Sequence, residues 1–290
     1  MSAGGGSHAG TPARGPGRSL GARLTRNESA IAGLALIVPV LALVLIAPAF
    51  YPVDPFDIVW RPLAPPGDAA AIPLGSDFVG RDVLAGIIHG GQTTLAVGLS
   101  AAALCVVVGI AVGAAAGFYG GLIDEALMRI AEFFQVLPAL LFAMTLVSLF
   151  GPSLVTIAVA IGAASWPPVA RLARAEVLRI KAHDYIRASR AIGASDRHLI
   201  WRVILPNALP PLIAAATLAV GAAILFEAGL AFLGLGNPDA MSWGLMMGAN
   251  RDFVVEAWWT VALPGLAIFV TVLGVSLVGD GLTDALDPKR

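Results

Sequence analysis

Residues 171–206 read RLARAEVLRIKAHDYIRASRAIGASDRHLIWRVILP, and this segment decides how the rest of the chain is interpreted. It holds eight of the 18 basic residues and separates two long apolar runs. At 36 residues it is longer than an ordinary connection between two packed helices. We therefore expect a folded element of its own here, outside an apolar layer.

The segment carries the pattern of a helix, a glycine break and a second helix. Four residues recur at helical spacing and predict one small or apolar face, formed by Tyr185, Ala188, Ser189 and Ile192. Arg187 and Arg190 fall off that face. Gly193 suits a left-handed helix end, and Ser195 or Asp196 suits the cap of the next helix. The second helix would carry Leu199, Ile200, Val203 and Ile204 before Pro206 starts the next apolar run.

Two interpretations of this element stay open on charge and periodicity alone. A short amphipathic helix of this kind can lie across a membrane face and offer a knob to another protein. Its eight basic residues can instead bind anionic lipid headgroups.

Composition places the remaining chain in a bilayer. Of the 290 residues, 58% are hydrophobic and 13% charged, with a mean hydropathy of +0.84. A soluble domain has about a quarter of its residues charged. The excess apolar surface therefore needs lipid as its solvent. The single cysteine, Cys105, lies in an apolar run and allows no disulfide within the chain, so we expect a small buried apolar side chain.

Six apolar runs predict an all-α protein with six transmembrane helices. The first, 31–50, has about 20 residues, enough to cross a hydrocarbon core. Ala47-Pro48-Ala49 resembles a signal-peptidase site, but the apolar region of a signal peptide has about 7–15 residues, so we expect an uncleaved helix. The other runs are 93–118, 127–149, 153–170, 208–233 and 258–279.

These runs divide the chain as follows. We expect a disordered cytoplasmic tail over 1–27, where Gly, Ser, Pro and Arg predominate, and a transmembrane domain over 28–290. Within that domain we expect a first helix over about 29–50, a periplasmic loop over 51–92, core helices over about 93–280 and a cytoplasmic loop over 171–207.

Basic residues set the predicted orientation. Four precede the first run, one lies at the start of the third, eight lie in 171–206 and two end the chain, so 15 of the 18 fall on one side. The other side has only Arg61, Arg81 and Arg251. Lys and Arg gather in cytoplasmic loops. Both termini are therefore predicted to be cytoplasmic.

Small residues and prolines indicate how the helices pack. Gly109, Gly113 and Gly117 recur every four residues in the second run, which lets helix backbones approach closely in lipid. Pro138 in the third run and Pro167-Pro168 at the end of the fourth predict a kink or a helix end.

The chain carries no pattern for its own energy source. Its two lysines, Lys181 and Lys289, follow Ile180 and Pro288, so no glycine-lysine phosphate loop is present. The four histidines lack the spacing of metal ligands. The middle turns of the apolar runs carry almost no acidic residues, and this absence disfavours a proton relay. Glu227, toward the outer end of the fifth run, is the acid that we single out. We expect no catalytic residue, cofactor or metal in this chain, and energy supplied by a partner.

The same segment resembles the signature of a known family. The stretch 188–193, nine further residues and Val203-Ile204-Leu205-Pro206 is similar to the "EAA" signature of ABC importer permeases. Arg187 stands where that family has Glu, Ser189 where it has Ala, and Val203 where it has Ile.

Further motifs resemble the dipeptide, oligopeptide and nickel branch of these permeases, in the form of the second permease of a pair. Thr283 departs from the Arg that the branch carries there. The matching motifs are Leu74-Gly75-Ser76-Asp77, Gly80-Arg81-Asp82, Phe232-Leu233-Gly234-Leu235-Gly236, Ser242-Trp243-Gly244, Pro264-Gly265, Gly279-Asp280-Gly281-Leu282 and Asp284-Ala285-Leu286-Asp287-Pro288.

The resemblance implies the fold of a type I ABC importer permease in a bacterial inner membrane. It implies a heterodimer with a homologous permease, two cytoplasmic subunits that use ATP and Mg²⁺, an extracytoplasmic solute-binding protein, membrane lipid and no nucleic acid. It implies a coupling loop that docks on the ATPase through Tyr185, Arg187, Ala188, Ser189, Ile192, Gly193, Leu205 and Pro206. Candidates for the periplasmic face or the pathway are Arg81, Asp82, Glu227 and Trp243.

The expected cargo is a di- or oligopeptide. Nickel, glutathione and an opine-like solute are the alternatives within the family. Outside it, the alternatives are an ion-coupled secondary transporter and a membrane scaffold that recruits a cytoplasmic partner without transport.

Overall fold

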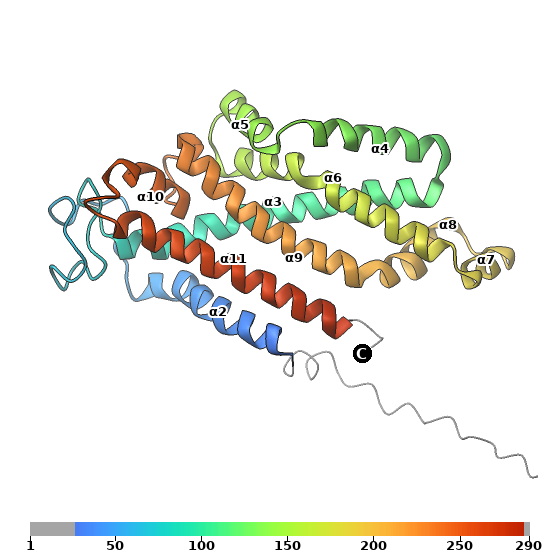
Figure 1. The fold of residues 1–290 in the computed structure, drawn as a ribbon, viewed down its shortest axis with the longest axis horizontal. Helices are drawn as coiled ribbons and strands as arrows, with labels where there is room; N and C mark the ends of the chain where they lie inside the picture. The colour runs from blue at the N-terminus through green and yellow to red at the C-terminus, as the bar shows by residue number, and fades with distance from the viewer. Residues whose placement is uncertain (1–26, 287–290) are drawn as a thin grey trace, which may run out of the picture.

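A computed structural model describes residues 27–286, and within this range the regular structure is helical apart from two isolated β-bridges. Long helices run side by side along the long axis of the molecule (Figure 1). The connection 51–82 and α10 lie at one end, and α7 and α8 lie at the other (Figure 1). The predicted tail 1–27 falls outside the described residues except for Asn27.

The helices are, in order, α2 (Glu28–Leu45), η1 (Ala47–Ala49), α3 (Val83–Tyr119), α4 (Gly121–Val136), α5 (Ala139–Phe150), α6 (Leu154–Lys181), α7 (Asp184–Ala191), α8 (Asp196–His198), η2 (Leu199–Ile204), α9 (Leu205–Leu230), η3 (Ala231–Leu235), α10 (Trp243–Asn250), η4 (Arg251–Phe253) and α11 (Trp259–Leu286). The elements from Asp196 to Leu235 follow one another as a single helical rod, which is interrupted only near its end by Gly234, at φ +85°.

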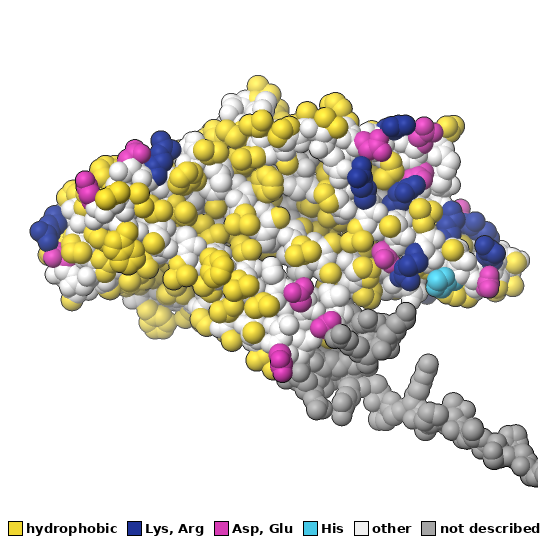
Figure 2. Space-filling model, in the orientation of Figure 1, with side chains coloured by type: hydrophobic (Ala, Val, Ile, Leu, Met, Phe, Trp, Pro, Cys, Tyr) yellow, Lys and Arg dark blue, Asp and Glu magenta, His cyan; other side chains and the backbone are white. Residues whose placement is uncertain are grey.

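Five helical segments are long and apolar enough to cross a membrane: α2 with η1, α3, α6, the rod from Asp196 to Leu235, and α11. Helices α4 and α5 are bent by 85° at their junction. If this bent pair is counted as one span, it is the sixth. Apolar side chains cover the middle of the molecule, and charged side chains gather at its two ends (Figure 2). The prediction of an all-α, multi-spanning protein is confirmed.

The third predicted span lies in place, and the kink or helix end that we predicted at Pro138 divides it into two helices. Instead of one helix over 127–149, α4 ends at Val136 and α5 starts at Ala139 in a new direction. Pro138 lies at this break, as its missing N–H predicts. Helix α4 is amphipathic, whereas α5 is apolar on all sides.

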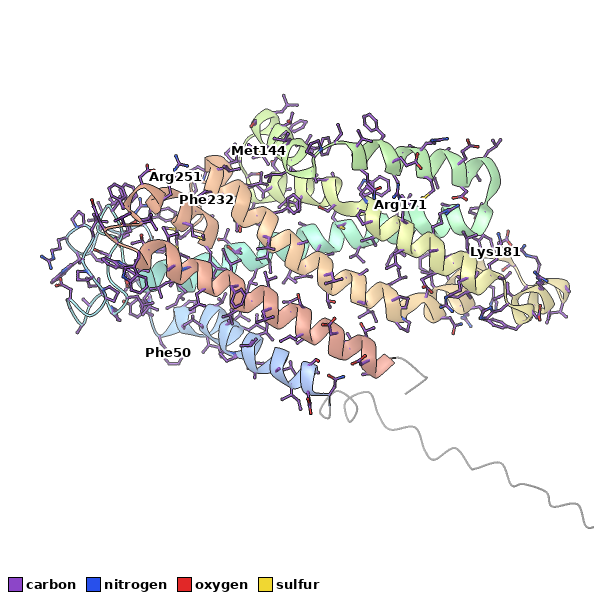
Figure 3. All side chains as sticks on the ribbon, in the orientation of Figure 1. Phe50, Met144, Arg171, Lys181, Phe232 and Arg251 are labelled. Carbon is purple, nitrogen blue, oxygen red and sulfur yellow. The ribbon has the colours of Figure 1, made fainter. Side chains whose placement is uncertain are left out.

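The fourth predicted span is too short, because α6 continues through Pro167-Pro168 to Lys181. Arg171 lies within this helix, and Lys181 lies at its end beside α7 (Figure 3). The connection that we expected from residue 171 therefore begins only at residue 182. Packing explains the difference, since α6 runs along α3, its most extensive partner, and buries side chains on both sides of the prolines.

The fifth span begins earlier than predicted, because Pro206 does not separate it from the preceding helix. The segment Leu199–Ile204 is a π-helix, which widens the turn just before the proline. A widened turn relieves the clash of the proline ring with the preceding carbonyl, so the rod continues.

The second span also begins earlier, at Val83 instead of residue 93. The Asp82 carboxylate accepts a hydrogen bond from the Leu84 amide at 2.9 Å and caps the helix. Gly90 and Gly91, within the predicted loop 51–92, lie in the helix and in close packing. A side chain at Gly91 would lie 2.4 Å from Val44 and 2.7 Å from Trp243.

The predicted glycine stripe of α3 does pack against a helix. A Cβ atom at Gly113 would lie 2.1 Å from the carbonyl oxygen of Ala170, and Gly109 and Gly117 face α6 in the same way. This close approach of α3 and α6 fixes the backbone on which both ends of the molecule are built.

We expect Gly113→Ala to lower the thermal unfolding temperature of the purified protein in detergent. The new methyl group forces α3 and α6 apart, and overpacking of this kind costs about 1–3 kcal/mol. Gly229→Ala in α9 is the matched control, because nothing lies within 4 Å of a Cβ there. Unfolding of both variants at the wild-type temperature would show that a methyl group at Gly113 does not force α3 and α6 apart.

Candidate functional site

Helix α7 forms the far tip of the molecule. Ile186 is buried, with 3% of its surface exposed, whereas Ile192 after the helix end is 87% exposed. The outward face therefore carries Tyr185, Ala188, Ala191 and Ile192. Ser189 was predicted on this face but is half-buried, and its hydroxyl donates to the Tyr185 carbonyl at 2.8 Å.

The break after α7 has the geometry that the sequence predicts. Gly193 has φ +93°, a left-handed conformation that side chains disfavour. The Gly193 amide donates to the Arg190 carbonyl, and the Ala194 amide to the Ser189 carbonyl, both at 3.1 Å. The Ser195 hydroxyl then accepts from the His198 amide at 3.3 Å and caps α8. Leu205 and Pro206 start α9, half-buried and exposed respectively.

Arg187 points away from the protein. Its side chain is 76% exposed and lies 3.9 Å from Asp184, which is itself 98% exposed. A pair with this exposure contributes at most about 1 kcal/mol to folding. The guanidinium is thus available to a partner at little cost in stability.

Phe118, at the end of α3, holds α7 in place. The Lys181 ammonium and the Arg190 guanidinium each lie 5.5 Å from the centre of its ring. Lys181 also donates to the Phe118 carbonyl at 2.5 Å, and Arg190 donates to Asp196 at 3.1 Å. Two cations on one ring therefore join α6 and α7 to α3.

Beneath this ring lies a small apolar core. It contains Ile186 of α7 together with Leu199 and Ile204 of the rod, all at most 3% exposed. Helix α7 is therefore packed against the ends of three long helices.

A second contact joins α4 to α6 at the same end. The Arg174 guanidinium donates two hydrogen bonds to the Asp124 carboxylate, at 2.5 and 2.6 Å. This forked geometry is the strongest arrangement of such a pair. It fixes the start of α4 against α6 and leaves the break at Pro138 as the bend between α4 and α5.

Arg81 and Asp82, two of the candidates for the periplasmic face or the pathway, hold the connection 51–82 onto α3. Arg81 lies over the Phe56 ring at 5.2 Å and donates to the Phe56 carbonyl at 3.2 Å. Asp82 caps α3 and also accepts a hydrogen bond from the Tyr51 hydroxyl. Burial, together with this carboxylate, raises the pKa of the Tyr51 phenol well above its usual value.

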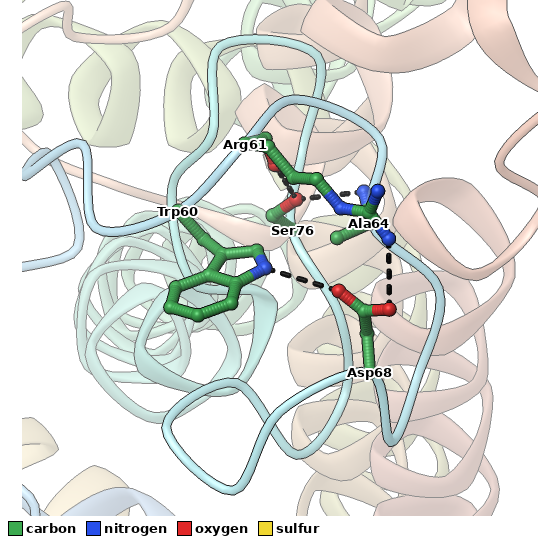
Figure 4. A network of polar contacts seen from close by, with 5 residues as sticks. All are labelled: Trp60, Arg61, Ala64, Asp68 and Ser76. Atoms are coloured by element: carbon green, nitrogen blue, oxygen red, sulfur yellow. Dashed lines mark hydrogen bonds and ion pairs between the residues drawn. The ribbon is translucent and has the colours of Figure 1, made fainter.

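The same connection is braced by a polar network (Figure 4). Asp68 accepts from the Trp60 indole at 3.0 Å and from Arg61 at 2.8 Å, and these two hydrogen bonds lower the pKa of its carboxyl. The Ser76 hydroxyl donates to the Arg61 carbonyl at 2.7 Å and accepts from the Ala64 amide at 2.9 Å. The end opposite α7 is thus an ordered cap.

Glu227 and Trp243 lie together where α3, α9 and α10 meet. The Trp243 side chain is fully buried and donates to the Ile87 carbonyl at 2.9 Å. The Glu227 carboxyl is 2% exposed, lies against the hydroxyls of Thr94 and Ser242, and has one oxygen, Oε2, without a hydrogen-bond partner in the structure. Both side chains lock α10 onto the bundle.

A cavity of about 650 Å³ lies between α3, α6, α9 and the break between α4 and α5. Alanine is the commonest residue in its wall, and the polar side chains that reach it are Gln135 and Ser165. None of the four pathway candidates lines it. Small apolar residues carry no chemical signal in a sequence, so Pro138 and Pro167-Pro168 were the available signs of this site.

Among the described residues, no group of three or more His, Cys, Asp or Glu side chains could hold a metal ion. The charged side chains near the two ends instead form pairs, such as Arg129 with Glu132 and Arg179 with Glu176.

Comparisons with known proteins agree on one family. Residues 109–290 match the family described as "Binding-protein-dependent transport system inner membrane component". The chain is 41% identical over 270 residues to the "Di/tripeptide transport system permease protein DppC" of Pseudomonas aeruginosa, covering 91% of this chain and 89% of that protein. It is 38% identical to the "Probable D,D-dipeptide transport system permease protein DdpC" of Escherichia coli, covering 89% and 87%.

The solved structures support the fold. A chain of the MetNI methionine ABC transporter in an inward-facing conformation matches with a TM-score of 0.59 at 21% identity, covering 70% of this chain and 96% of that chain.

We expect Phe118→Ala to loosen α7 without unfolding the bundle. Loss of two cation–π contacts, each of about 0.5–1 kcal/mol, should speed amide hydrogen exchange over residues 184–191 by roughly fivefold or more. Leu122→Ala is the control, because that nearby side chain is 83% exposed. Unchanged exchange in the Phe118 variant would show that α7 is held by other contacts.

Proposed function

The chain belongs to the family of binding-protein-dependent transport system inner membrane components, and from this membership we propose that it forms half of the translocation pathway of an ATP-driven peptide importer. A homologous permease would supply the other half. Two cytoplasmic subunits would bind and hydrolyse ATP with Mg²⁺, and an extracytoplasmic protein would deliver the solute.

The observation that carries the proposal is the exposed tip of α7. An isoleucine that is 87% exposed, beside two alanines and a tyrosine, is an apolar surface at the most charged end of the molecule. Exposed apolar side chains on a helix that is packed firmly against the rest of the protein are typical of protein–protein contacts. We propose that this tip docks on the ATP-binding subunit and that Arg187 meets an acidic group there.

The fold also supplies a route for the motion. We propose that closure of the ATP-binding subunits moves α7, that Phe118 carries this movement to α3, and that α3 carries α6 with it along the glycine contact. The bundle would then change between inward-facing and outward-facing states.

Peptide is the proposed cargo because relatives at 36–41% identity are named as dipeptide or di/tripeptide permeases. Nickel or another small solute is the alternative within the family. An ion-coupled secondary transporter gains less support, since no acidic side chain lines the cavity between the long helices.

We expect Ile192→Asp to abolish ATP-dependent uptake of a dipeptide into cells while the protein stays at its wild-type level in the membrane. A carboxylate at the centre of the tip cannot be buried in an apolar contact without a large desolvation cost. His198→Asp, which places the same charge on an exposed site of the same connection, should transport normally. Normal uptake by the Ile192 variant would remove the tip from the mechanism.

Uptake that persists in vesicles without ATP, and collapses with an uncoupler, would instead establish the ion-coupled alternative. That outcome is independent of any substitution in α7.

We propose that both termini face the cytoplasm, because the basic residues predict it. A fluorescent protein fused after Arg290 should therefore be bright, and alkaline phosphatase fused after residue 68 should be active. The reverse pattern, with a dark C-terminal fusion and an inactive phosphatase, would invert the topology.

A further inference from the structure

The cavity between α3, α6 and α9 lies near the middle of each helix. Its wall includes Ala101 of α3, Ala164 of α6 and Ala219 of α9, each about halfway along its segment. A volume of about 650 Å³ falls within the range of small-molecule sites. The cavity is thus placed at the depth where a transported solute must pass.

The backbone around this cavity is irregular. At the α4–α5 break, Leu137 and Pro138 are extended, and α5 begins without a side-chain cap. The first amides of α5 therefore have no partner from a side chain. Free backbone groups at membrane depth are tolerated where they line a cavity that water or a solute occupies, and not where lipid covers them.

The α6 wall adds free acceptors. Pro167 and Pro168 have no N–H, so the carbonyls of Ala163 and Ala164 lose their helical donors. The Cys105 thiol donates to the next carbonyl, that of Ser165, at 3.2 Å. The lining therefore includes the uncapped start of α5 on one side and, on the other, Ala164, whose carbonyl lacks its regular helical donor, around an apolar floor.

From these features we infer that the cavity receives an apolar side chain of the transported peptide, with the adjoining peptide bond turned toward the freed backbone groups of α5 and α6. This inference rests on the proposed function and adds a substrate preference to it. A peptide bond has both the N–H and the C=O that such a wall can pair, and a metal ion has neither.

Charge supports the same occupant. No Lys, Arg, Asp or Glu is among the residues that line the cavity. The charged ends of a peptide are therefore not held there by ion pairs, and an apolar side chain is the part that gains from burial, at about 25 cal/mol per Å². Contact through apolar surface and a few neutral hydrogen bonds is weak enough to release the solute again, as passage requires.

The test compares two dipeptides in cells that carry the complete transporter. Ala219→Leu fills part of the cavity and should lower the uptake of alanyl-phenylalanine about tenfold relative to alanyl-alanine, because apolar pockets discriminate by size on this scale. Phe226→Ala, which enlarges the cavity, should raise the relative uptake of alanyl-tryptophan. Because every variant is supplied by the same binding protein, a changed ratio belongs to the permease.

Ala216→Leu is the matched control, since Ala216 lies on the same helix and does not line the cavity; it should leave the ratio unchanged. An unchanged ratio in both the Ala219 and Phe226 variants overturns the inference and leaves peptide transport intact. Absence of ATP-dependent uptake of any dipeptide by the wild type overturns the proposed function instead. An Ala219 variant that fails to assemble is recognised by its loss of both dipeptides, and the Phe226 variant then decides.

Discussion

Every backbone group in the hydrocarbon layer must find a partner, and this constraint orders the whole molecule. Most of the chain meets it with long unbroken helices, of which α3 and the rod from Asp196 to Leu235 are the longest. The exceptions are therefore informative. The α4–α5 break and the proline pair of α6 lie together on the cavity at mid-depth, where something other than lipid can satisfy the freed groups.

The same long helices connect that cavity to the tip. The ring of Phe118, which Lys181 and Arg190 contact, lies near the end of α3. The middle of the same helix forms part of the cavity wall. Because α3 and α6 approach at backbone distance along Gly113, we expect them to move together in the proposed mechanism. A displacement of α7 is thus transmitted to the cavity without an additional hinge. Beyond the bend at Pro138, α5 also packs against α6, with Ala143 and Val147 buried in the core that α3 and α6 share.

The sequence predicted the apolar spans, the glycine contact, the bend at Pro138 and the turn at Gly193, since each depends on local chemistry. It failed where packing overrides local preference. Pro167-Pro168 and Pro206 do not end helices, because neighbouring helices and a π-helical turn stabilise them. Arg81, Asp82 and Trp243, named as candidates for the periplasmic face or the pathway, make structural contacts that the sequence did not predict. The alanines of the cavity wall could not be predicted as a site, because alanine carries no distinctive chemistry. They form a cavity only once the helices that carry them have packed together.

The central claim is that ATP-derived energy enters this chain through the tip of α7. Photo-crosslinking tests it most directly, with p-benzoyl-phenylalanine in place of Ile192, in membranes that contain the whole transporter. We predict an adduct between this chain and the ATP-binding subunit, identified by mass spectrometry, and none with that subunit when the probe replaces Phe50 at the other end. Adducts with lipid alone from position 192 would contradict the account and would make α7 an interfacial helix.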